Sequence, residues 1–132
     1  MQNFNFMINN QIRHFSHLNA WKKNHCLVLK VYKLARKFPK DELFGLVSQI
    51  RRAVSSITAN IAEGYGRFHY GDKVRFYTIA RDSSAEVQNY LIIAKDLGYI
   101  TKEEFDEIKV INFEGYKLIC GLIQSTEKFR NF

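Results

Sequence analysis

The residues of this chain most able to do chemistry are the lysines and arginines of its first forty residues. No acidic residue precedes Asp41, so this segment carries a formal charge of +8, while the whole chain of 132 residues carries +7. Such one-sided positive charge favours a polyanionic partner, of which nucleic acid is the commonest. A solvated helix face that keeps a protein soluble has the same composition, so charge alone does not separate the two interpretations.

The candidate phosphate contacts are the cations of the first predicted helix and three arginines further along the chain. They are Lys22, Lys23, Lys30, Lys33, Lys37, Arg51, Arg52 and Arg67. Few aromatic residues can be identified as exposed platforms for base stacking. We therefore expect contact with the backbone of structured RNA, in preference to DNA, and little readout of base sequence.

Histidine and cysteine are not placed as catalysis or metal binding would require. A di-iron bundle needs Glu-x-x-His pairs, and none of the four histidines lies three residues after a glutamate. Cys26 has no base or oxyanion donor that the sequence can locate. The Gly64-Tyr65-Gly66 turn lacks the preceding strand of a phosphate-binding loop. We expect no catalytic residue, no metal ligand and no cofactor.

The sequence also predicts a cytoplasmic location. The uncharged stretch 1–12 is full of Asn and Gln, unlike a signal peptide. No uncharged apolar run approaches the ~20 residues that span a bilayer, so we expect no membrane partner. The two cysteines, Cys26 and Cys120, are too few for a disulfide framework and are expected to remain thiols.

Four helices are predicted to position these residues, because the chain holds one proline and long stretches free of turn residues. Residues 1–19 lack periodicity and are expected to form a flexible tail or docking arm, leaving residues 20–132 as the folded domain. The first helix is predicted over 20–38, capped by Asn19 and stopped by Pro39. The second is predicted over 42–63, capped by Asp41 and ended by the Gly64–Gly66 turn.

The third and fourth helices carry clear end signals. The third is predicted over 72–97, with Gly98 at its C-terminal cap. Thr101 followed by Glu104 is a capping box that starts the fourth helix, which reaches about residue 128. Short connections between the four favour an all-α, antiparallel up-down-up-down four-helix bundle.

Two heptad seams predict how the second and third helices pair. Both follow the alternating spacing of four and three residues that a helical hairpin needs. The first comprises Leu43, Val47, Ile50, Val54, Ile57 and Ile61, and the second Phe76, Ala80, Ser83, Val87, Tyr90 and Ala94. Antiparallel pairing across the short turn places Ile57 opposite Ala80 and Ile50 opposite Val87.

The first and fourth helices are apolar around too much of their circumference for a surface helix of a monomer. On the first helix, Trp21, Val28, Tyr32 and Ala35 form one stripe, and Leu27, Val31, Leu34 and Phe38 form another. Homo-oligomerisation would cover the second stripe. A tightly wrapped monomer core is the alternative.

The segment QIRRAVSSITANIAEGYGR, residues 49–67, carries a polar stripe behind the apolar seam. Its members are Gln49, Arg52, Ser56, Asn60 and Glu63. Short polar side chains favour a half-buried hydrogen-bonding row, with Glu63 able to reach either Arg67 one turn on or Arg75 across the hairpin.

This segment resembles the bacterial four helix bundle proteins, also called 23S rRNA intervening-sequence or S23-ribosomal-like proteins. The most specific match is Asn60-Ile61-Ala62-Glu63-Gly64 followed by Gly66-Arg67, within a resemblance that covers about 18–129. Thr58 stands where the family usually has proline, and Asp82 where it often has glycine.

The resemblance implies a four-helix protomer that assembles into a ring, with a pentamer expected, and no catalytic activity. The related accessory proteins of diversity-generating retroelements bind a reverse transcriptase and present a basic surface to nucleic acid. Our first hypothesis is therefore a non-enzymatic, homopentameric protein that binds nucleic acid. The alternative is a scaffold or accessory subunit that docks a protein such as a reverse transcriptase.

Overall fold

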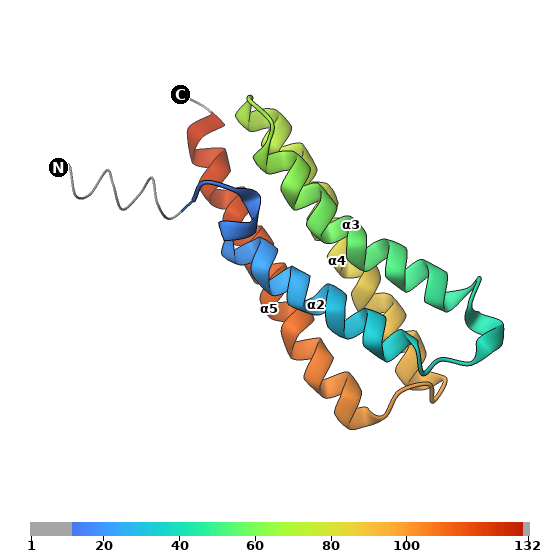
Figure 1. Ribbon diagram of the computed structural model, residues 1–132. Helices are drawn as coiled ribbons and strands as arrows, with labels where there is room; N and C mark the ends of the chain where they lie inside the picture. Colours follow the sequence, from blue (N-terminus) through green and yellow to red (C-terminus); the bar gives the residue numbers. More distant parts are fainter. Residues whose placement is uncertain (1–11, 131–132) are drawn as a thin grey trace.

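A computed structural model describes residues 12–130, which form four long α-helices and two short 3-10 helices (Figure 1). The α-helices are α2 (Asn19–Ala35), α3 (Leu46–Tyr65), α4 (Tyr70–Asp96) and α5 (Lys102–Arg130), and the 3-10 helices are η1 (Phe15–His17) and η2 (Lys40–Glu42). No strand occurs within the described residues. The predicted all-α bundle is confirmed.

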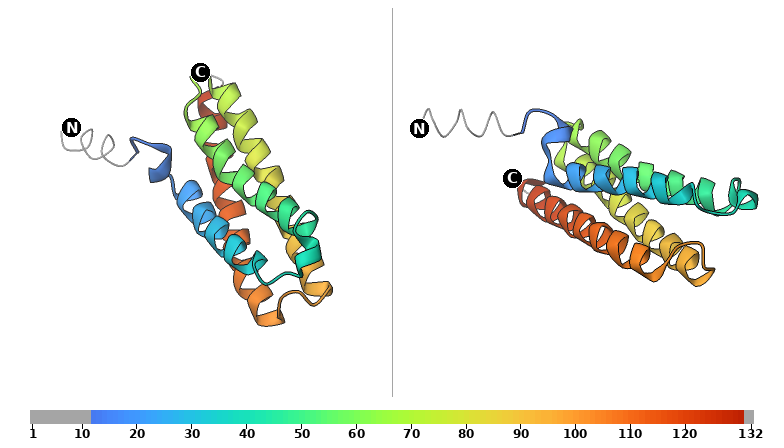
Figure 2. Two further views of the ribbon diagram at one scale, coloured as in Figure 1. Left: turned by 45° about the vertical axis from the view of Figure 1, so that its right-hand side comes forward. Right: turned by 60° about the horizontal axis from the view of Figure 1, so that its bottom comes forward.

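The helices pack in a ring, since α2 contacts α3 and α5, and α4 also contacts both of these. Figures 1 and 2 show consecutive helices running antiparallel. The α3–α4 turn lies at the same end as the C-terminus of α5 and the start of α2, while the α2–α3 and α4–α5 connections lie at the opposite end (Figure 1). The turn end and the connection end are therefore separated by the length of α3, about 30 Å at 1.5 Å per residue.

The first helix begins one residue earlier and ends three residues earlier than predicted. Asn19 is its first residue, the cap position is Leu18, and no side chain caps the helix, so the prediction of Asn19 as the cap was wrong. After Ala35 the chain turns, and Phe38 is buried in the core beside the Tyr99 ring. Because Phe38 packs into the core, the chain leaves the helix before Pro39.

The predicted start of the second helix was also wrong, because η2 and a turn occupy residues that we expected to be helical. Instead of Asp41 acting as the cap, the Glu42 carboxylate accepts a hydrogen bond from the backbone N–H of Leu46 (3.4 Å). The same carboxylate accepts a second hydrogen bond from the Tyr99 hydroxyl (2.8 Å). This tertiary contact holds the turn and delays the helix to Leu46.

The glycine signal at the end of the third helix and the capping box at the start of the fourth are confirmed. The third helix, however, begins at Tyr70, two residues before the predicted start, and its cap residue is Leu97, with Gly98 next to it. Gly98 adopts φ +77°, and the N–H of Tyr99 donates to the Ala94 carbonyl (2.9 Å), which closes α4 in a Schellman motif. At α5, the Thr101 N–H donates to Glu104 Oε1 (2.9 Å) and the Glu104 N–H donates to Thr101 Oγ1 (3.1 Å). These reciprocal bonds are the predicted capping box.

The core lies between all four α-helices. Its α3 seam was predicted well except at the first member. Leu43 is exposed because it precedes the helix. On α4, Phe76 and Tyr90 are only partly buried. The buried positions include the predicted Ala80, Ser83, Val87 and Ala94, and also Val74, Tyr77, Ser84 and Leu91. A straight helix has 3.6 residues per turn and drifts from a strict seven-residue repeat, which broadens this face by one position. The facing of Ile57 to Ala80 and of Ile50 to Val87 stays a prediction, although all four side chains are buried.

Much of the apolar surface of the first helix is covered within the single chain. Leu27 and Val31 are buried, and Trp21, Val28 and Leu34 pack against the core. Leu29 remains 59% exposed. The core of a single chain therefore covers most of the second apolar stripe, as the monomer alternative expects.

Residues 1–11 of the predicted tail lie outside the described residues. Just before α2, η1 forms one turn, in which the His14 ring accepts a hydrogen bond from the Ser16 N–H (3.3 Å). The Phe15 ring contacts the Trp21 ring edge-on, at 5.6 Å between centroids. No helix within residues 12–130 is long and apolar enough to cross a membrane.

Candidate nucleic-acid interface

The five candidate lysines of α2 divide between two faces of the helix. At 100° per residue, Lys23 and Lys30 share the face toward α5, and Lys37, two residues beyond the end of α2, continues their row. Lys22 faces outward, and Lys33 lies between the two faces, nearer to Lys22, where it also lines the groove between α2 and α5. Each of Lys23, Lys30 and Lys37 meets a glutamate of α5. Lys23 pairs with Glu114 (2.9 Å between Nζ and Oε2), Lys30 with Glu107 (3.4 Å between Nζ and Oε1), and Lys37 with Glu104. We call these three pairs the α2–α5 ladder.

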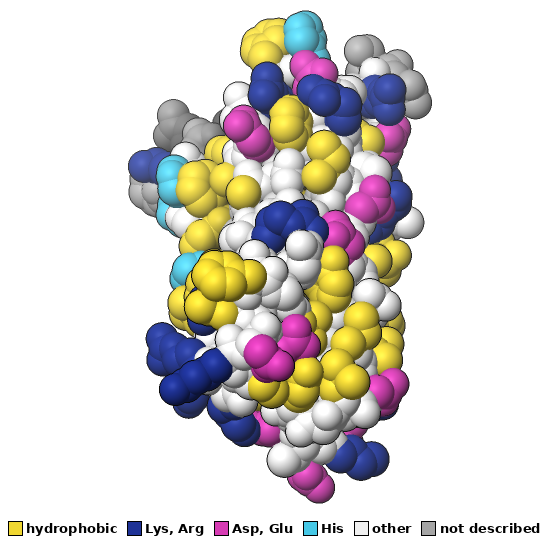
Figure 3. Space-filling model, turned by 90° about the vertical axis from the view of Figure 1, so that its right-hand side faces the viewer, with side chains coloured by type: hydrophobic (Ala, Val, Ile, Leu, Met, Phe, Trp, Pro, Cys, Tyr) yellow, Lys and Arg dark blue, Asp and Glu magenta, His cyan; other side chains and the backbone are white. Residues whose placement is uncertain are grey.

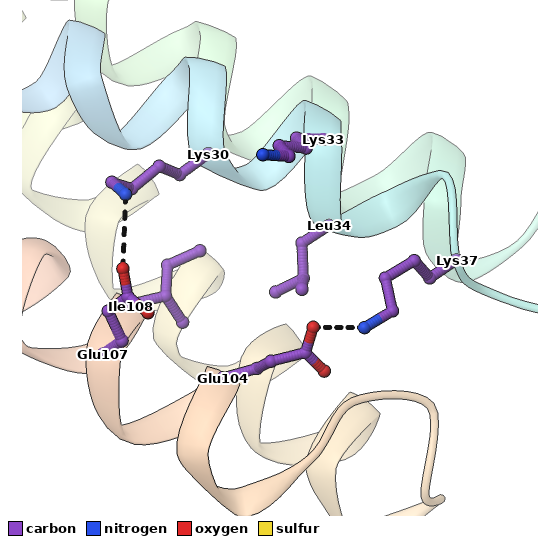
Figure 4. Close-up of a pocket in the computed structure, with 7 residues that line it drawn as sticks. All are labelled: Lys30, Lys33, Leu34, Lys37, Glu104, Glu107 and Ile108. Carbon is purple, nitrogen blue, oxygen red and sulfur yellow. Dashed lines mark hydrogen bonds and ion pairs between the residues drawn. The ribbon is translucent and has the colours of Figure 1, made fainter.

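The ladder borders a groove between α2 and α5 whose floor is formed by Leu34 and Ile108 (Figure 4). In Figure 4, Lys30 and Lys37 extend across the groove to their glutamates, whereas no contact joins Lys33 to the residues drawn. The hydrogen bond from Lys37 lowers the pKa of Glu104, and the hydrogen bond to Glu114 raises the pKa of Lys23. Because carboxylates neutralise three of its lysines, this side of α2 is poorly suited to a polyanion.

The side chains of four cations on the outward side of α2 and just beyond it make no hydrogen bond or ion pair within residues 12–130. They are Lys22, Lys33, Arg36 and Lys40. Lys22, Lys33 and Arg36 share one exposed face, with Leu29 between them. Lys and Arg side chains gather at the lower left of the molecular face in Figure 3. The outward cations are free to contact phosphate.

Arg51 lies at a groove between α2 and α3. Arg36, Lys40 and Arg51 are its charged lining residues, and its apolar walls are formed by Ala35, Phe38, Pro39, Leu43 and Val47. The Arg51 guanidinium lies over the Tyr32 ring, 5.2 Å from the centroid. Its Nε is buried and has no hydrogen-bond partner. We call this groove the basic groove. None of its lining residues is acidic, so no carboxylate of the groove itself offsets its three cations.

The other two candidate arginines are engaged with acids. Arg52 contacts Glu86 across the α3–α4 pair (3.0 Å), and this hydrogen bond raises its pKa. Arg67 pairs with Glu63 (3.6 Å), one of the two predicted alternatives, and lies 4.5 Å above the centre of the Phe76 ring. The structure therefore brings Arg51 to the cationic surface of α2 but ties Arg52 to α4 and leaves Arg67 at the turn end.

The polar stripe of α3 is half-buried, as predicted, only at Ser56 and Asn60, whereas Gln49, Arg52 and Glu63 are exposed. Asn60 Nδ2 donates to the Ser56 carbonyl (2.8 Å), and Arg52 donates to Gln49 Oε1 (3.2 Å), both within α3. The Ser56 and Ser83 hydroxyls are 2.9 Å apart, and this contact joins α3 to α4 beside the apolar seam.

The glycines of the same motif shape the turn that follows. Gly64 packs against the buried Tyr77 ring so closely that a Cβ there would lie 2.6 Å from Tyr77 Cε1. Burial raises the pKa of Tyr77 to about 12. Helix α3 ends at Tyr65, two residues later than predicted, with Gly66 as its cap. Lys73 donates to the Tyr65 carbonyl (2.6 Å) at this end of the helix. Gly64, Gly66 and Lys73 thus serve the turn between α3 and α4.

Within residues 12–130, no group of three or more His, Cys, Asp and Glu side chains could hold a metal ion. The His25 ring stacks on Trp21, at 4.5 Å and 11° between planes, as a packed histidine would. Cys26 and Cys120 are half-buried free thiols.

Sequence reasoning missed Arg36 and Lys40 as members of the cationic surface. For Arg36 the signal was present, since it falls on the same helical face as Lys22 and Lys33. Lys40 could not be found in this way because it lies in η2, outside the helix.

Two comparisons with known proteins bear on the chain. A structure of a protein of unknown function from the S23 ribosomal protein family of Bacteroides thetaiotaomicron is 25% identical, with a TM-score of 0.74, and the match covers 79% of this chain and 97% of that one. No curated protein matches. The family model of the 23S rRNA-intervening sequence protein matches residues 16–121. Since that match spans most of the bundle, the chain belongs to the 23S rRNA-intervening sequence protein family.

Proposed function

We propose that this protein is a non-enzymatic, cytoplasmic homo-oligomer, a pentamer, that binds structured RNA through the outward cations of α2 and the basic groove. The observation that carries the proposal is the groove of Arg36, Lys40 and Arg51, which no acidic residue lines. Arginine suits this role because its planar guanidinium can bind phosphate with two hydrogen bonds.

The spacing of the outward cations supports contact with a nucleic-acid backbone. Lys22 and Arg36 are fourteen residues apart on one face, about 21 Å along the helix axis. Cations spread over this length can meet several phosphates, which gives affinity without base specificity. The net charge of +7 adds long-range attraction for any polyanion.

Exposed apolar side chains on α4 and α5 support assembly. Ile92, Leu97, Val110 and Phe113 are each exposed by more than a third of their surface. A ring of identical chains would cover such side chains and repeat the cationic face of α2, which multiplies the number of phosphate contacts.

The test compares two triple variants of α2 in binding to a fluorescent stem-loop RNA over a range of salt concentrations. The first changes the outward residues Lys22, Lys33 and Arg36 to Gln, and the matched control changes the ladder lysines Lys23, Lys30 and Lys37 to Gln. Both remove three charges from one helix and keep good helix propensity. The salt slope is the steepness with which the logarithm of the affinity falls against the logarithm of the salt concentration. We expect the outward variant to lower this slope by up to about three units, roughly one per lost phosphate contact, and the control to change it little.

Two results would contradict this assignment. Equal loss of slope in both variants would mean that the two faces of α2 contribute alike. Absence of binding by the unaltered protein at low salt would remove the nucleic-acid proposal altogether.

A protein-docking role is the second candidate, and one observation favours it. Phe44 is 91% exposed beside Leu43, a lining residue of the basic groove. An apolar and acidic segment of a partner, such as a reverse transcriptase, would suit a basic groove with an exposed phenylalanine at its edge. Phe44→Ala should then abolish capture of that partner while leaving the salt slope of RNA binding unchanged.

A further inference from the structure

The end of the bundle at the α3–α4 turn presents aromatic rings to solvent. Phe68 is 88% exposed, and its ring meets His69 edge-on (5.1 Å between centroids, 90°). Beside the turn, the Tyr70 ring stacks on Phe129 of α5 at 5.7 Å and 26°, and both rings are partly exposed. We call Phe68, Tyr70 and Phe129 the aromatic end. Together the three exposed rings form an apolar patch at one end of the bundle, the kind of surface that marks an interaction site.

Three arginines lie at the same end of the bundle as these rings. The guanidinium groups of Arg67 and Arg75 lie over the Phe76 ring, 4.5 and 4.7 Å from its centroid. Arg75 and Arg130 also line a shallow groove beside the turn, together with His69, Gly71, Asp72 and Val74. Arg130 is paired with Glu127, whereas Arg75 has no acidic partner among the residues described.

Exposed rings beside arginines form the kind of surface that binds unpaired nucleotides. Every base has a flat π-face that stacks on an aromatic side chain, and arginine supplies both stacking and phosphate contact. A paired duplex hides these faces within its own stack. The aromatic end therefore suits single-stranded nucleic acid, whereas the lysines of α2 suit a backbone in any conformation.

We propose that the aromatic end binds unpaired nucleotides of a single-stranded segment. Phe68 is the main stacking side chain, the Tyr70–Phe129 pair is a second platform, and Arg75 contacts an intervening phosphate. This inference rests on the proposed function and adds the part of the nucleic acid that is held there. The aromatic end and the basic groove lie at opposite ends of α3, so an RNA touching both spans about 30 Å.

The experiment measures binding to two RNAs of equal length, a stem with a loop of unpaired uridines and a fully paired blunt duplex. The readout is the ratio of the two affinities, because backbone contacts contribute to both RNAs and stacking only to the first. A 2-aminopurine in the loop reports stacking by quenching of its fluorescence. The unaltered protein should prefer the looped RNA by about fivefold or more, the lower end of the effect of stacking one base.

The test variant is Phe68→Leu, which keeps an apolar side chain but removes the ring. It should bring the affinity ratio close to one and abolish the quenching, while Phe68→Tyr should retain both. Phe44→Leu is the matched control, because Phe44 is 91% exposed at the opposite end of the bundle, and it should leave the ratio unchanged. Both positions are exposed, so the melting temperatures of all three variants should match that of the unaltered protein.

The outcomes separate this inference from the proposed function. Equal binding of both RNAs by the unaltered protein, or an unchanged ratio in Phe68→Leu, would overturn the aromatic end and leave the α2 contact standing. Binding of the looped RNA alone, lost in Phe68→Leu, would support the aromatic end and remove the α2 contact. No binding of either RNA would overturn both, and a change in assembly mass in Phe68→Leu would place Phe68 between subunits and overturn this inference.

Discussion

At the scale of single residues, close approach between helices depends on missing side chains. Gly64 lies against the Tyr77 ring, and Gly115 lies against Asn24, whose Nδ2 donates to the Gly115 carbonyl (3.2 Å). A Cβ at position 115 would lie 2.5 Å from Asn24 Oδ1. The two glycines set how near α3 comes to α4 and α2 comes to α5.

Gly64→Ala should lower the free energy of unfolding by about 1–3 kcal/mol, because the new methyl group would overlap the packed Tyr77 ring. Urea unfolding measures the change. Gly121→Ala is the matched control, since a Cβ there would meet nothing within 4 Å. The control should be neutral or raise stability by up to about 1 kcal/mol, as alanine favours the helix. A stabilising effect at both positions would show that the helices separate at no cost.

Tyr77 also makes stability depend on alkaline pH. Its pKa is raised to about 12 from an ordinary value near 10, so the folded state holds its proton more tightly than the unfolded state. The resulting stabilisation is complete below pH 10 and is lost as the pH rises through 12. Urea midpoints should therefore fall between pH 10 and 12, and Tyr77→Phe should flatten that fall. Tyr99, whose pKa the hydrogen bond to Glu42 also raises, will leave some slope in the variant.

At the scale of the elements, the two connections at one end of the bundle are tied together. The Tyr99 hydroxyl donates to Glu42, and the same carboxylate holds the N–H of Leu46 at the start of α3. One residue of the α4–α5 connection thus fixes where a helix begins more than fifty residues earlier in the chain.

Tyr99→Phe removes this hydrogen bond and should lower the free energy of unfolding by about 1 kcal/mol, the net effect of one hydrogen bond. Tyr116→Phe serves as the control, because the Tyr116 hydroxyl has no hydrogen-bond partner within residues 12–130. It should leave the urea midpoint unchanged. Equal losses in the two variants would mean that the Tyr99–Glu42 bond does not contribute to stability.

The same contact explains which element ends could be predicted from the sequence. The capping box at Thr101 and the glycine at position 98 work through neighbours in the chain, so local pattern revealed them. The start of α3 depends on the contact of Glu42 with Tyr99, which is distant in the sequence, so a local sequence pattern could not predict it. The cationic surface divides in the same way, because the charge of α2 is visible in the sequence, whereas the neutralisation of Lys23, Lys30 and Lys37 requires α5 to be placed beside them.

At the scale of the whole molecule, the apolar side chains left exposed on α4 and α5 predict association. Sedimentation at micromolar concentration should give a multiple of the 15.5 kDa chain mass, five for the proposed ring. Ile92→Glu combined with Phe113→Glu should shift the protein toward the single-chain mass, because burying carboxylates between subunits is costly. Recovery of 15.5 kDa from the unaltered protein would end the proposal of assembly, and a stable dimer would end only that of the pentamer.

The α2–α5 ladder joins the first long helix to the last, so the two partners of each ion pair are synthesised at different times. Lys23, Lys30 and Lys37 leave the ribosome well before Glu104, Glu107 and Glu114 have been made. At about 5–20 residues per second the interval is on the order of 3–13 s. During that time the nascent chain carries its full excess of positive charge beside ribosomal RNA, and completion of α5 withdraws three of those charges from competition for phosphate.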